Sequence, residues 1–334
     1  MTLLQKTLKN KFFYLFLGSL VLGVFIGVLG TNYYNNSSQL LDNLPELHAG
    51  GYKLINPLYE CNNRKTYGVI EFRDLENTLN DYVNKITSKN SVTAVSIYFR
   101  DLNNGPWFGI NEKADFAPSS LLKLPVMMAY FSKAQTDPSI LTKKIKYEKD
   151  PQGLIPQNFK PLQPLEKGKE YTVEQLIEKM IIGSDNVALG LLEDNINGKD
   201  IDKVTLDLGI PTATDKTPEN FMNVKDYSAL FRVLFNASYL NRVYSEKALD
   251  ILSHSEFKKG IVDSIPAGIT IAHKFGERYF PGGINQLHDC GIVYYPNHPY
   301  LLCVMTRGQD FNDLATTIQQ ISAKIYSELV KRYH

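Results

Sequence analysis

The stretch FAPSSLLKLPVMM, residues Phe116 to Met128, sets a single lysine into an apolar run, three residues after a serine. Residues at positions i and i+3 lie on one helix face, so the amine of Lys123 would sit beside the hydroxyl of Ser120. A neighbouring base of this kind activates a serine nucleophile. The structural alternative is that Ser120 caps a helix and Lys123 is a solvated helical residue. The spacing alone does not decide, since Ser255 and Lys258 repeat it in a polar segment.

Length, charge and cysteine content limit the class of protein. The chain has 334 residues, enough for one large domain or two ordinary ones. Its 36 Lys and Arg residues nearly balance its 35 Asp and Glu residues, so the global charge predicts no nucleic-acid partner. Three cysteines are too few for a disulfide scaffold, and their spacing predicts no metal site. Cys290 and Cys303 fall on expected neighbouring strands, but the geometry of adjacent strands argues against a bridge between them.

The N-terminal segment has the composition of a membrane anchor. Residues 12–30, FFYLFLGSLVLGVFIGVLG, carry no charge and follow lysines within residues 1–11. At about 1.5 Å per residue, a helix of this run approaches the thickness of the hydrocarbon core, and the lysines favour a cytoplasmic N-terminus. A cleaved signal peptide is the alternative, but the run exceeds the usual apolar region of one. We therefore expect a single-pass protein of the cell membrane with an extracytoplasmic catalytic domain; signal cleavage would instead give a secreted protein.

The remaining chain is predicted to form one folded domain after a linker. Residues 31–51 are polar and turn-rich, so the domain is expected over residues 52–334. Apolar spacing predicts a helix and two strands over residues 68–117, mainly helices over 118–259, and strands with a closing helix over 260–334. An antiparallel sheet built from both ends of the domain, with an inserted helical lobe, is a two-lobed α/β (α+β) arrangement.

Two further motifs follow the first one in the chain. IIGSDNVALG contains Ser184-Asp185-Asn186 at the junction of two helical segments, and such a tripeptide is rare by chance. IAHKFGERYF contains Lys274-Phe275-Gly276 at the end of a strand-like run. The order Ser-x-x-Lys, Ser-Asp-Asn, Lys-x-Gly is the signature set of class A β-lactamases and penicillin-binding proteins. Over about residues 68–332 the chain therefore resembles the class A β-lactamase-like branch of the penicillin-recognising serine enzymes.

The resemblance assigns the acyl-transfer chemistry to motif residues. Ser120 would be the acylated nucleophile, Lys123 the neutral base or proton relay, and Ser184 would pass a proton to the leaving nitrogen. The residue types agree with these roles, because a serine hydroxyl is a poor nucleophile until a base takes its proton. A lysine is such a base only where burial and nearby cations lower its pKa. The apolar run around Lys123 would supply the burial, and Lys274 the cation.

The resemblance also places residues around the substrate. Asn186 would hold the amide side chain of the substrate, and Lys274 would attract its carboxylate. Gly276 completes the third motif, and the next residue is Glu277. The backbone N–H groups of Glu277 and Ser120 would form the oxyanion hole.

The third motif and the loop expected to carry the deacylating base depart from the family pattern. Phe275 replaces the usual Thr or Ser, which removes a hydroxyl for the substrate carboxylate and leaves the substrate preference open. In the shortened loop, Glu219 and Asn223 keep the relation that the family uses for deacylation. The alternative is that Asn223 caps a helix with Asp226 as its acidic third residue, and that Glu219 merely precedes this helix. Asp215 is the next carboxylate to consider in this loop.

Two residues late in the chain have both a binding and a structural interpretation. His288, on the strand after the third motif, would help to bind a substrate carboxylate or would be a structural histidine. Arg307, at the end of the next strand, would contact the carboxylate or would be a solvated strand-end charge. The chain has no His-Glu-x-x-His pair, so a zinc hydrolase is not expected. We expect neither a metal nor a cofactor.

These features predict a membrane-tethered serine hydrolase that forms an acyl-enzyme with a β-lactam and hydrolyses its amide. A D-Ala-D-Ala carboxypeptidase or transpeptidase of peptidoglycan metabolism is the alternative, because the same acylation serves a D-Ala-D-Ala-like peptide. A penicillin-binding sensor that stays acylated is the third interpretation. The rate at which water removes the acyl group separates these three functions, and the role of Glu219 leaves that rate open.

Overall fold

The computed structural model describes most of the chain after residue 46, and the chain divides into two units, Met1–Pro45 and Glu46–His334. The described residues are 22–28, 31, 47–48, 50–60, 72–88, 91–103, 105–213 and 216–333. In the first unit, residues 22–28 are helical and exposed. Within the described ranges, no helix has both the length and the apolar content needed to cross a bilayer. The rest of the predicted anchor, residues 12–30, lies outside the described residues.

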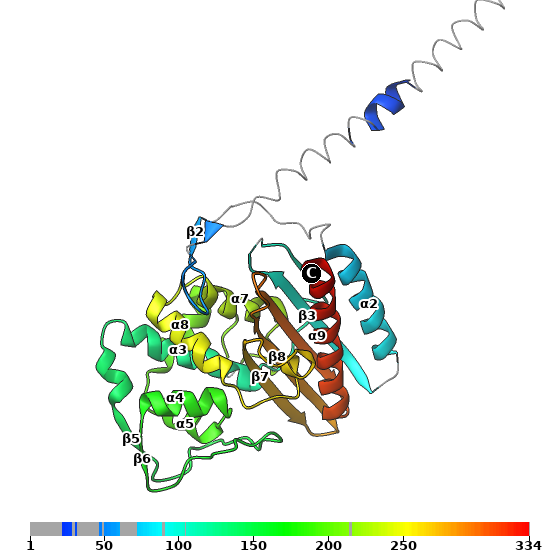
Figure 1. Ribbon diagram of the computed structural model, residues 1–334. Helices are drawn as coiled ribbons and strands as arrows, with labels where there is room; N and C mark the ends of the chain where they lie inside the picture. The colour runs from blue at the N-terminus through cyan, green and yellow to red at the C-terminus, as the bar shows by residue number, and fades with distance from the viewer. Residues whose placement is uncertain are drawn as a thin grey trace, which may run out of the picture. The chain divides into compact units, whose positions relative to one another are not determined.

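A five-stranded antiparallel sheet is the framework of the second unit (Figure 1). The strand order is β4-β3-β9-β8-β7. The strands are β3 (Val92–Asp101), β4 (Trp107–Ile110), β7 (Ile271–Phe280), β8 (Ile284–Val293) and β9 (Tyr300–Gly308). β-Branched and aromatic residues fill β3, VTAVSIYFRD, as expected for a strand buried on both faces. The prediction that both ends of the domain contribute to one sheet is confirmed.

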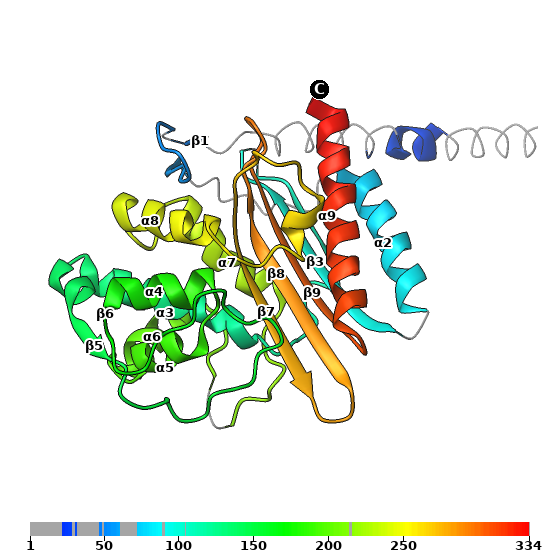
Figure 2. The same ribbon diagram turned by 60° about the horizontal axis from the view of Figure 1, so that its bottom comes forward.

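Helices α2 (Arg73–Thr87) and α9 (Phe311–Tyr333) cover one face of this sheet (Figure 2). The closing helix predicted over residues 260–334 is α9, and one stripe of apolar side chains along it is buried throughout: Leu314, Ile318, Ile321, Ile325 and Leu329. These side chains share one core cluster with the apolar residues of β3 and β9, including Val95 and Val304. Full burial of an aliphatic side chain stabilises a fold by roughly 1.5–3 kcal/mol. The packing of α9 against this face of the sheet therefore contributes substantially to the stability of the domain.

The opposite face of the sheet carries the predicted helical lobe (Figure 2). Its helices are α3 (Lys123–Ala134), α4 (Val173–Ile182), α5 (Asn186–Glu193), α6 (Gly198–Asp207), α7 (Val224–Phe235) and α8 (Arg242–Ser253). A small hairpin of β5 (Lys144–Lys146) and β6 (Glu170–Thr172) extends the lobe. Ten of the twelve residues of α3 are buried, which explains why its sequence is apolar on all sides. This buried helix begins at the lysine of the first motif.

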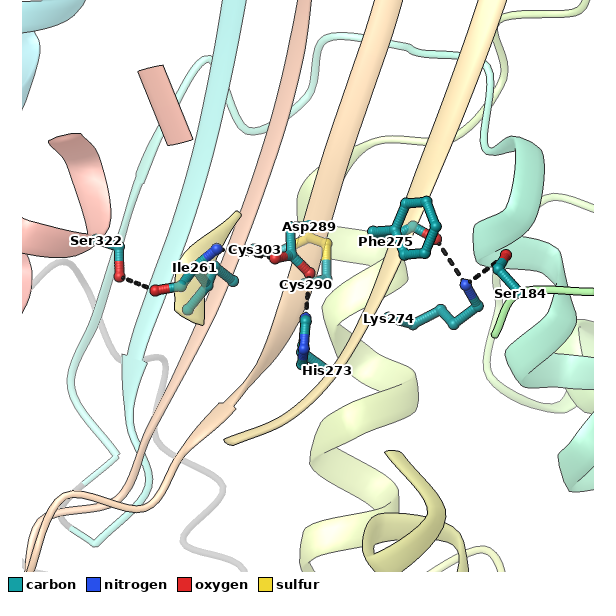
Figure 3. Close-up of polar contacts among 9 residues, drawn as sticks. All are labelled: Ser184, Ile261, His273, Lys274, Phe275, Asp289, Cys290, Cys303 and Ser322. Atoms are coloured by element: carbon teal, nitrogen blue, oxygen red, sulfur yellow. Dashed lines mark hydrogen bonds and ion pairs between the residues drawn. A yellow bond between two sulfur atoms is a disulfide. The ribbon is translucent and has the colours of Figure 1, made fainter. Parts of the chain in front are cut away.

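Two sequence expectations about the second unit need correction. Cys290 on β8 and Cys303 on β9 are direct cross-strand partners with Cα atoms 3.9 Å apart, and they form a disulfide (Figure 3). The prediction that adjacent-strand geometry argues against this disulfide was wrong. Residues that lie directly opposite each other on two strands are closer together than other pairs on those strands. In the predicted linker, residues 31–51, strand β1 (Leu47–His48) already pairs with β2 (Leu58–Glu60).

Candidate active site

Ser120 lies in the 3-10 helix η2 (Ser119–Leu122), directly before α3. The N-cap of η2 is Pro118, and no side chain caps this helix, so the capping interpretation of Ser120 is wrong. Its hydroxyl oxygen Oγ instead accepts a hydrogen bond from Lys123 Nζ at 3.2 Å. Ser119 before it has a φ of 51°, a left-handed conformation that non-glycine residues adopt rarely. The turn therefore presents the Ser120 hydroxyl to a buried amine.

Lys123 is fully buried, which excludes the interpretation of a solvated helical lysine. Besides Ser120 Oγ, three oxygens lie within hydrogen-bond distance of its Nζ: the carbonyl oxygen of Ser184 at 2.6 Å, Ser184 Oγ at 3.1 Å and Asn186 Oδ1 at 2.6 Å. Because an amine has at most three N–H groups, Nζ does not donate to all four oxygens at once. Burial lowers its pKa to about 7, although Asp185 and Glu277 act in the opposite direction. Near neutral pH, a large fraction of this amine is thus unprotonated and able to accept a proton.

Ser184 lies between α4 and α5, where the second motif was expected at a helix junction. Asp185 is the N-cap of α5 and accepts from the backbone N–H groups of Val187 and Ala188. Ser184 has a φ of 54° and is fully buried. Its Oγ accepts from Lys123 and, at 2.9 Å, from Lys274 Nζ (Figure 3). One hydroxyl therefore connects the two motif lysines.

Lys274 is on β7 and is also fully buried. Its Nζ donates to Ser184 Oγ and to the carbonyl oxygen of Phe275, each at 2.9 Å, and lies 4.3 Å from the centre of the Phe275 ring. Burial first, and the charge of Lys123 second, hold the pKa of Lys274 well below its usual value. The two buried amines, Lys123 and Lys274, both lie beside the Ser184 hydroxyl. Burial and their mutual repulsion therefore disfavour the state in which both amines are protonated.

Gly276 allows β7 to approach the turn that carries the nucleophile. A Cβ at this position would lie 2.9 Å from the carbonyl oxygen of Pro118 and 3.0 Å from Leu121 Cγ. Such contacts would force the strand away from η2, so the glycine of the third motif is a packing requirement. Glu277, the next residue, consequently lies beside the nucleophile turn.

A cavity of about 450 Å³ opens in front of these groups. Its lining includes Ser120, Lys123, Asn186, Glu277 and the segment Gln152–Gln157. Asn186 uses Oδ1 for Lys123 and donates from Nδ2 to the carbonyl oxygen of Ile155 at 2.8 Å. An amide nitrogen carries two hydrogens, so one donor of Asn186 is left for a ligand.

Glu219 also lines the cavity, but its carboxylate forms an ion pair with Arg278. Asn223 accepts from the backbone N–H of Asp226 at 2.9 Å and caps α7, as the structural interpretation predicted. The polar partners of Lys123 are Ser120, Ser184 and Asn186, and Glu219 is not one of them. Asp215, the other carboxylate considered in this loop, lies outside the described residues.

His288 and Arg307 do not line the cavity as described. His288 is fully buried; its Nε2 lies 3.0 Å from the carbonyl oxygen of Ala117, and its Nδ1 accepts from the N–H of Thr306. Burial lowers its pKa to about 4, so it is a neutral structural histidine that supports the segment before the nucleophile. Arg307 donates to the carbonyl oxygen of Asp115 at 2.8 Å. Both side chains therefore make structural contacts in the described residues, and their binding to a substrate stays a prediction.

Two glutamines that the motifs did not indicate also support the site. Gln157 donates from Nε2 to the carbonyl oxygen of Ser184 at 2.7 Å. Gln286 is buried on β8 and accepts from the N–H of Ala117 at 2.9 Å. Both act on the backbone of a motif or its neighbour, and no local sequence pattern identifies such long-range contacts.

Comparisons with known proteins agree with this arrangement. A family model described as the β-lactamase enzyme family matches residues 75–329. β-Lactamase VEB-1 of Pseudomonas aeruginosa is 24% identical over 269 residues, which are 74% of this chain and 86% of VEB-1.

Similar folds occur among solved structures. PBP-A is 22% identical with a TM-score of 0.64, over 76% of this chain and 96% of PBP-A. A class A β-lactamase from Mycobacterium abscessus is 19% identical with a TM-score of 0.65, over 75% of this chain and 99% of that enzyme. The structures establish the likeness of fold, and the family model spans most of the chain. The chain therefore belongs to the β-lactamase enzyme family, and its fold is that of class A β-lactamases.

Proposed function

We propose that this protein opens β-lactam amides through an acyl group on Ser120 and then hydrolyses that acyl group slowly. The observation that carries the proposal is the contact between Ser120 Oγ and a buried Lys123 whose pKa is about 7. Few structural roles require a fully buried amine hydrogen-bonded to two serine hydroxyls, because burying an amine is costly.

The acylation step follows from these contacts. Ser120 Oγ attacks the carbonyl carbon of the substrate amide while its proton passes to neutral Lys123. The backbone N–H groups of Ser120 and Glu277 are the proposed donors to the oxyanion. Lys123 then returns the proton through the hydroxyl of Ser184 to the leaving nitrogen as the carbon–nitrogen bond breaks. Lys274 donates to the same hydroxyl and favours this direction of transfer.

The slow second step is supported by the surroundings of Glu219. A general base must reach the attacking water with an available oxygen. The ion pair with Arg278 holds Glu219 through Oε1, and the cap of α7 uses Oδ1 of Asn223. A D-Ala-D-Ala carboxypeptidase or transpeptidase is the second candidate function, and this same observation favours it. PBP-A, which shares the fold, has been solved as a mutant acyl-enzyme complex with penicillin G.

The test uses the full chain in detergent and a fluorescent penicillin. We expect rapid labelling of Ser120, followed by slow release and by more than one equivalent of opened β-lactam per chain. Because Glu219 is held by Arg278, Glu219→Gln should change the release rate by less than about threefold. Slowing by 10²–10⁴-fold would instead identify Glu219 as the base. A label that persists without further product would contradict the hydrolase, and release of D-alanine from a D-Ala-D-Ala peptide would then favour the peptidase.

The pKa of Lys123 predicts the pH dependence of acylation. Only the neutral amine accepts the Ser120 proton, and below a pKa of about 7 its fraction falls tenfold per pH unit. The rate of Ser120 labelling should therefore rise about tenfold per unit up to pH 7 and level off above it. Stopped-flow labelling between pH 5 and 9 measures this profile. A rate that keeps rising up to pH 9 would mean that Lys123 keeps its ordinary pKa.

We further propose that residues 12–30 anchor the protein in the cell membrane and that the catalytic domain is extracytoplasmic. The uncharged run after a lysine-bearing start supports this orientation. The native protein should then keep its first residues and remain in the membrane fraction after a high-salt wash. Mass spectrometry of its N-terminus measures this directly. A mature chain that begins near Thr31 would identify a cleaved signal peptide instead.

A further inference from the structure

One face of helix α5 lines the cavity from the first residue of the helix to the last. Asn186, Leu189, Gly190 and Glu193 all belong to the cavity lining. Their spacing of i, i+3, i+4 and i+7 places them one after another along one side of the helix. Asn186 begins α5 and Glu193 ends it. At about 1.5 Å of rise per residue, these two positions lie roughly 10 Å apart along the helix axis. The cavity therefore extends from Asn186 to the end of α5.

One loop packs along this face of α5. Pro151 contacts Gly190, where a Cβ would lie 2.3 Å from Pro151 Cβ, so only glycine allows this approach. Four residues later, the carbonyl oxygen of Ile155 accepts from Asn186 Nδ2 at 2.8 Å. The loop thus runs along α5 in the opposite direction. The side chains of Leu154 and Ile155 are exposed and line the cavity. The loop therefore gives this part of the cavity an apolar wall.

Glu193 is an unpaired carboxylate at the end of this wall. Its side chain is accessible to solvent, and its carboxylate forms no hydrogen bond or ion pair with any residue that the structure describes. The surrounding protein removes part of its hydration and raises its pKa, and the charge of Asp194 acts in the same direction. The last turn of α5 also holds no basic residue. A helix C-terminus carries partial negative charge, so a glutamate is unfavourable there unless a cation is near.

The cations around this end of the cavity are not paired with Glu193. Among the described lining residues, Arg278 forms its ion pair with Glu219. Lys123 is fully buried, although the charge of Glu193 acts to raise its pKa. A neighbouring hollow shares Glu193 with the cavity, and its other described charged residues are Lys144, Lys146, Glu148, Lys149, Asp150 and Asp194. Two of these exposed lysines form ion pairs with other glutamates. None of the three forms one with Glu193 in the described part of the chain.

Asn186 indicates which part of a substrate would reach Glu193. The resemblance assigns the amide of the acyl side chain to Asn186, which keeps one N–H for it. The substrate carboxylate, on the side of the leaving nitrogen, is assigned instead to Lys274 on β7. An acyl side chain that continues beyond the amide could therefore follow α5 and the apolar loop toward Glu193.

We propose that Glu193 binds a cationic group at the end of the acyl side chain, so that the protein prefers β-lactams whose side chain has an apolar stem and a terminal ammonium. The stem would lie against Leu154 and Ile155. The ammonium would supply the ion-pair partner that Glu193 lacks and would offset the negative end of α5. This inference rests on the proposed acylation of Ser120 and adds the class of side chain to it.

The experiment uses three penicillins whose acyl side chains have the same length and differ only at the end. The aminohexanoyl chain ends in an ammonium, the heptanoyl chain in a methyl group and the pimeloyl chain in a carboxylate. Intact-protein mass spectrometry measures the rate of acylation of Ser120 in the full chain at low penicillin concentration. A partly exposed ion pair changes binding by roughly two- to fivefold. We therefore expect the ammonium to react about two- to fivefold faster than the methyl, and the methyl faster than the carboxylate by a similar factor.

Glu193→Gln should bring both rate ratios close to one. Each ratio compares substrates within one variant, so an effect of the substitution on Lys123 cancels. The control is Glu178→Gln, which removes an exposed carboxylate of α4 that does not line the cavity as described. This variant should keep the wild-type ratios.

Two results would overturn the inference. One is equal acylation rates for the three penicillins in the wild type. The other is a preference for the ammonium that persists unchanged in Glu193→Gln. The proposed function fails separately, if none of the three penicillins acylates Ser120.

Discussion

Replacing Ser120 with alanine should abolish covalent labelling by a fluorescent penicillin, the largest effect that we expect from any single substitution. The reason is chemical, because alanine has no atom that can form the ester bond to the acyl group. The side chain is small and only partly buried, and it accepts a hydrogen bond from Lys123. The variant should therefore fold, and gel fluorescence after denaturation measures the loss directly.

The matched control is Ser255→Ala. Ser255 has a lysine at the same spacing, Lys258, and lies in the same lobe. Among the residues that the structure describes, the buried Oγ of Ser255 has no hydrogen-bond partner, and Lys258 is exposed, so the pair lacks the contact made by Ser120 and Lys123. This variant should label like the wild type. Persistent labelling of Ser120→Ala would place the nucleophile elsewhere and remove the basis of the proposed mechanism.

Periodicity and motif order were sufficient to predict the sheet and the grouping of the three motifs. The stripe from Leu314 to Leu329 repeats at helical spacing, so burial of one face was the only stable arrangement for that helix. Ser120, Lys123 and Ser184 come together because a buried helix start meets a helix junction. The burial of this helix face and the grouping of the motif residues follow from short patterns in the sequence. That is why they could be predicted.

The deacylation loop shows why other parts of the site were not predictable. The spacing of Glu219 and Asn223 fits a catalytic pair, yet Arg278, 59 residues away in sequence, pairs with the carboxylate. The side chain of Asn223 is used locally by α7. Similarly, the burial of His288 depends on the position of β8 between two other strands, which sequence spacing does not report. Contacts between distant segments decide such roles, and a single sequence carries little information about them.

The substitution Lys123→Met should slow acylation of Ser120 by about 10²–10⁴-fold, the range for loss of a positioned general base. Methionine keeps a long unbranched side chain in the apolar surroundings of α3, so packing should be retained. The matched control is Lys258→Met, which removes the exposed lysine of the second Ser-x-x-Lys pair, Ser255 and Lys258. A decrease of less than about threefold in Lys123→Met would mean that Lys123 is not the base, and Lys274 would be the next amine to test.

The same variant has a second expected effect, on the free energy of unfolding. Because burial lowers the pKa of Lys123 to about 7, the unfolded chain binds more protons than the folded chain between pH 7 and about 10.5. The free energy of unfolding of the wild type should therefore rise with pH across this window, with Lys123 contributing up to about 1.4 kcal/mol per pH unit. Lys123→Met should lose this contribution. The free energy of unfolding of the variant, minus that of the wild type, should therefore be larger at pH 7 than at pH 9. Denaturant unfolding of both proteins at the two pH values measures this difference. An unchanged pH dependence in the variant would show that Lys123 has an ordinary pKa in the folded protein, and the mechanism would then lack its base.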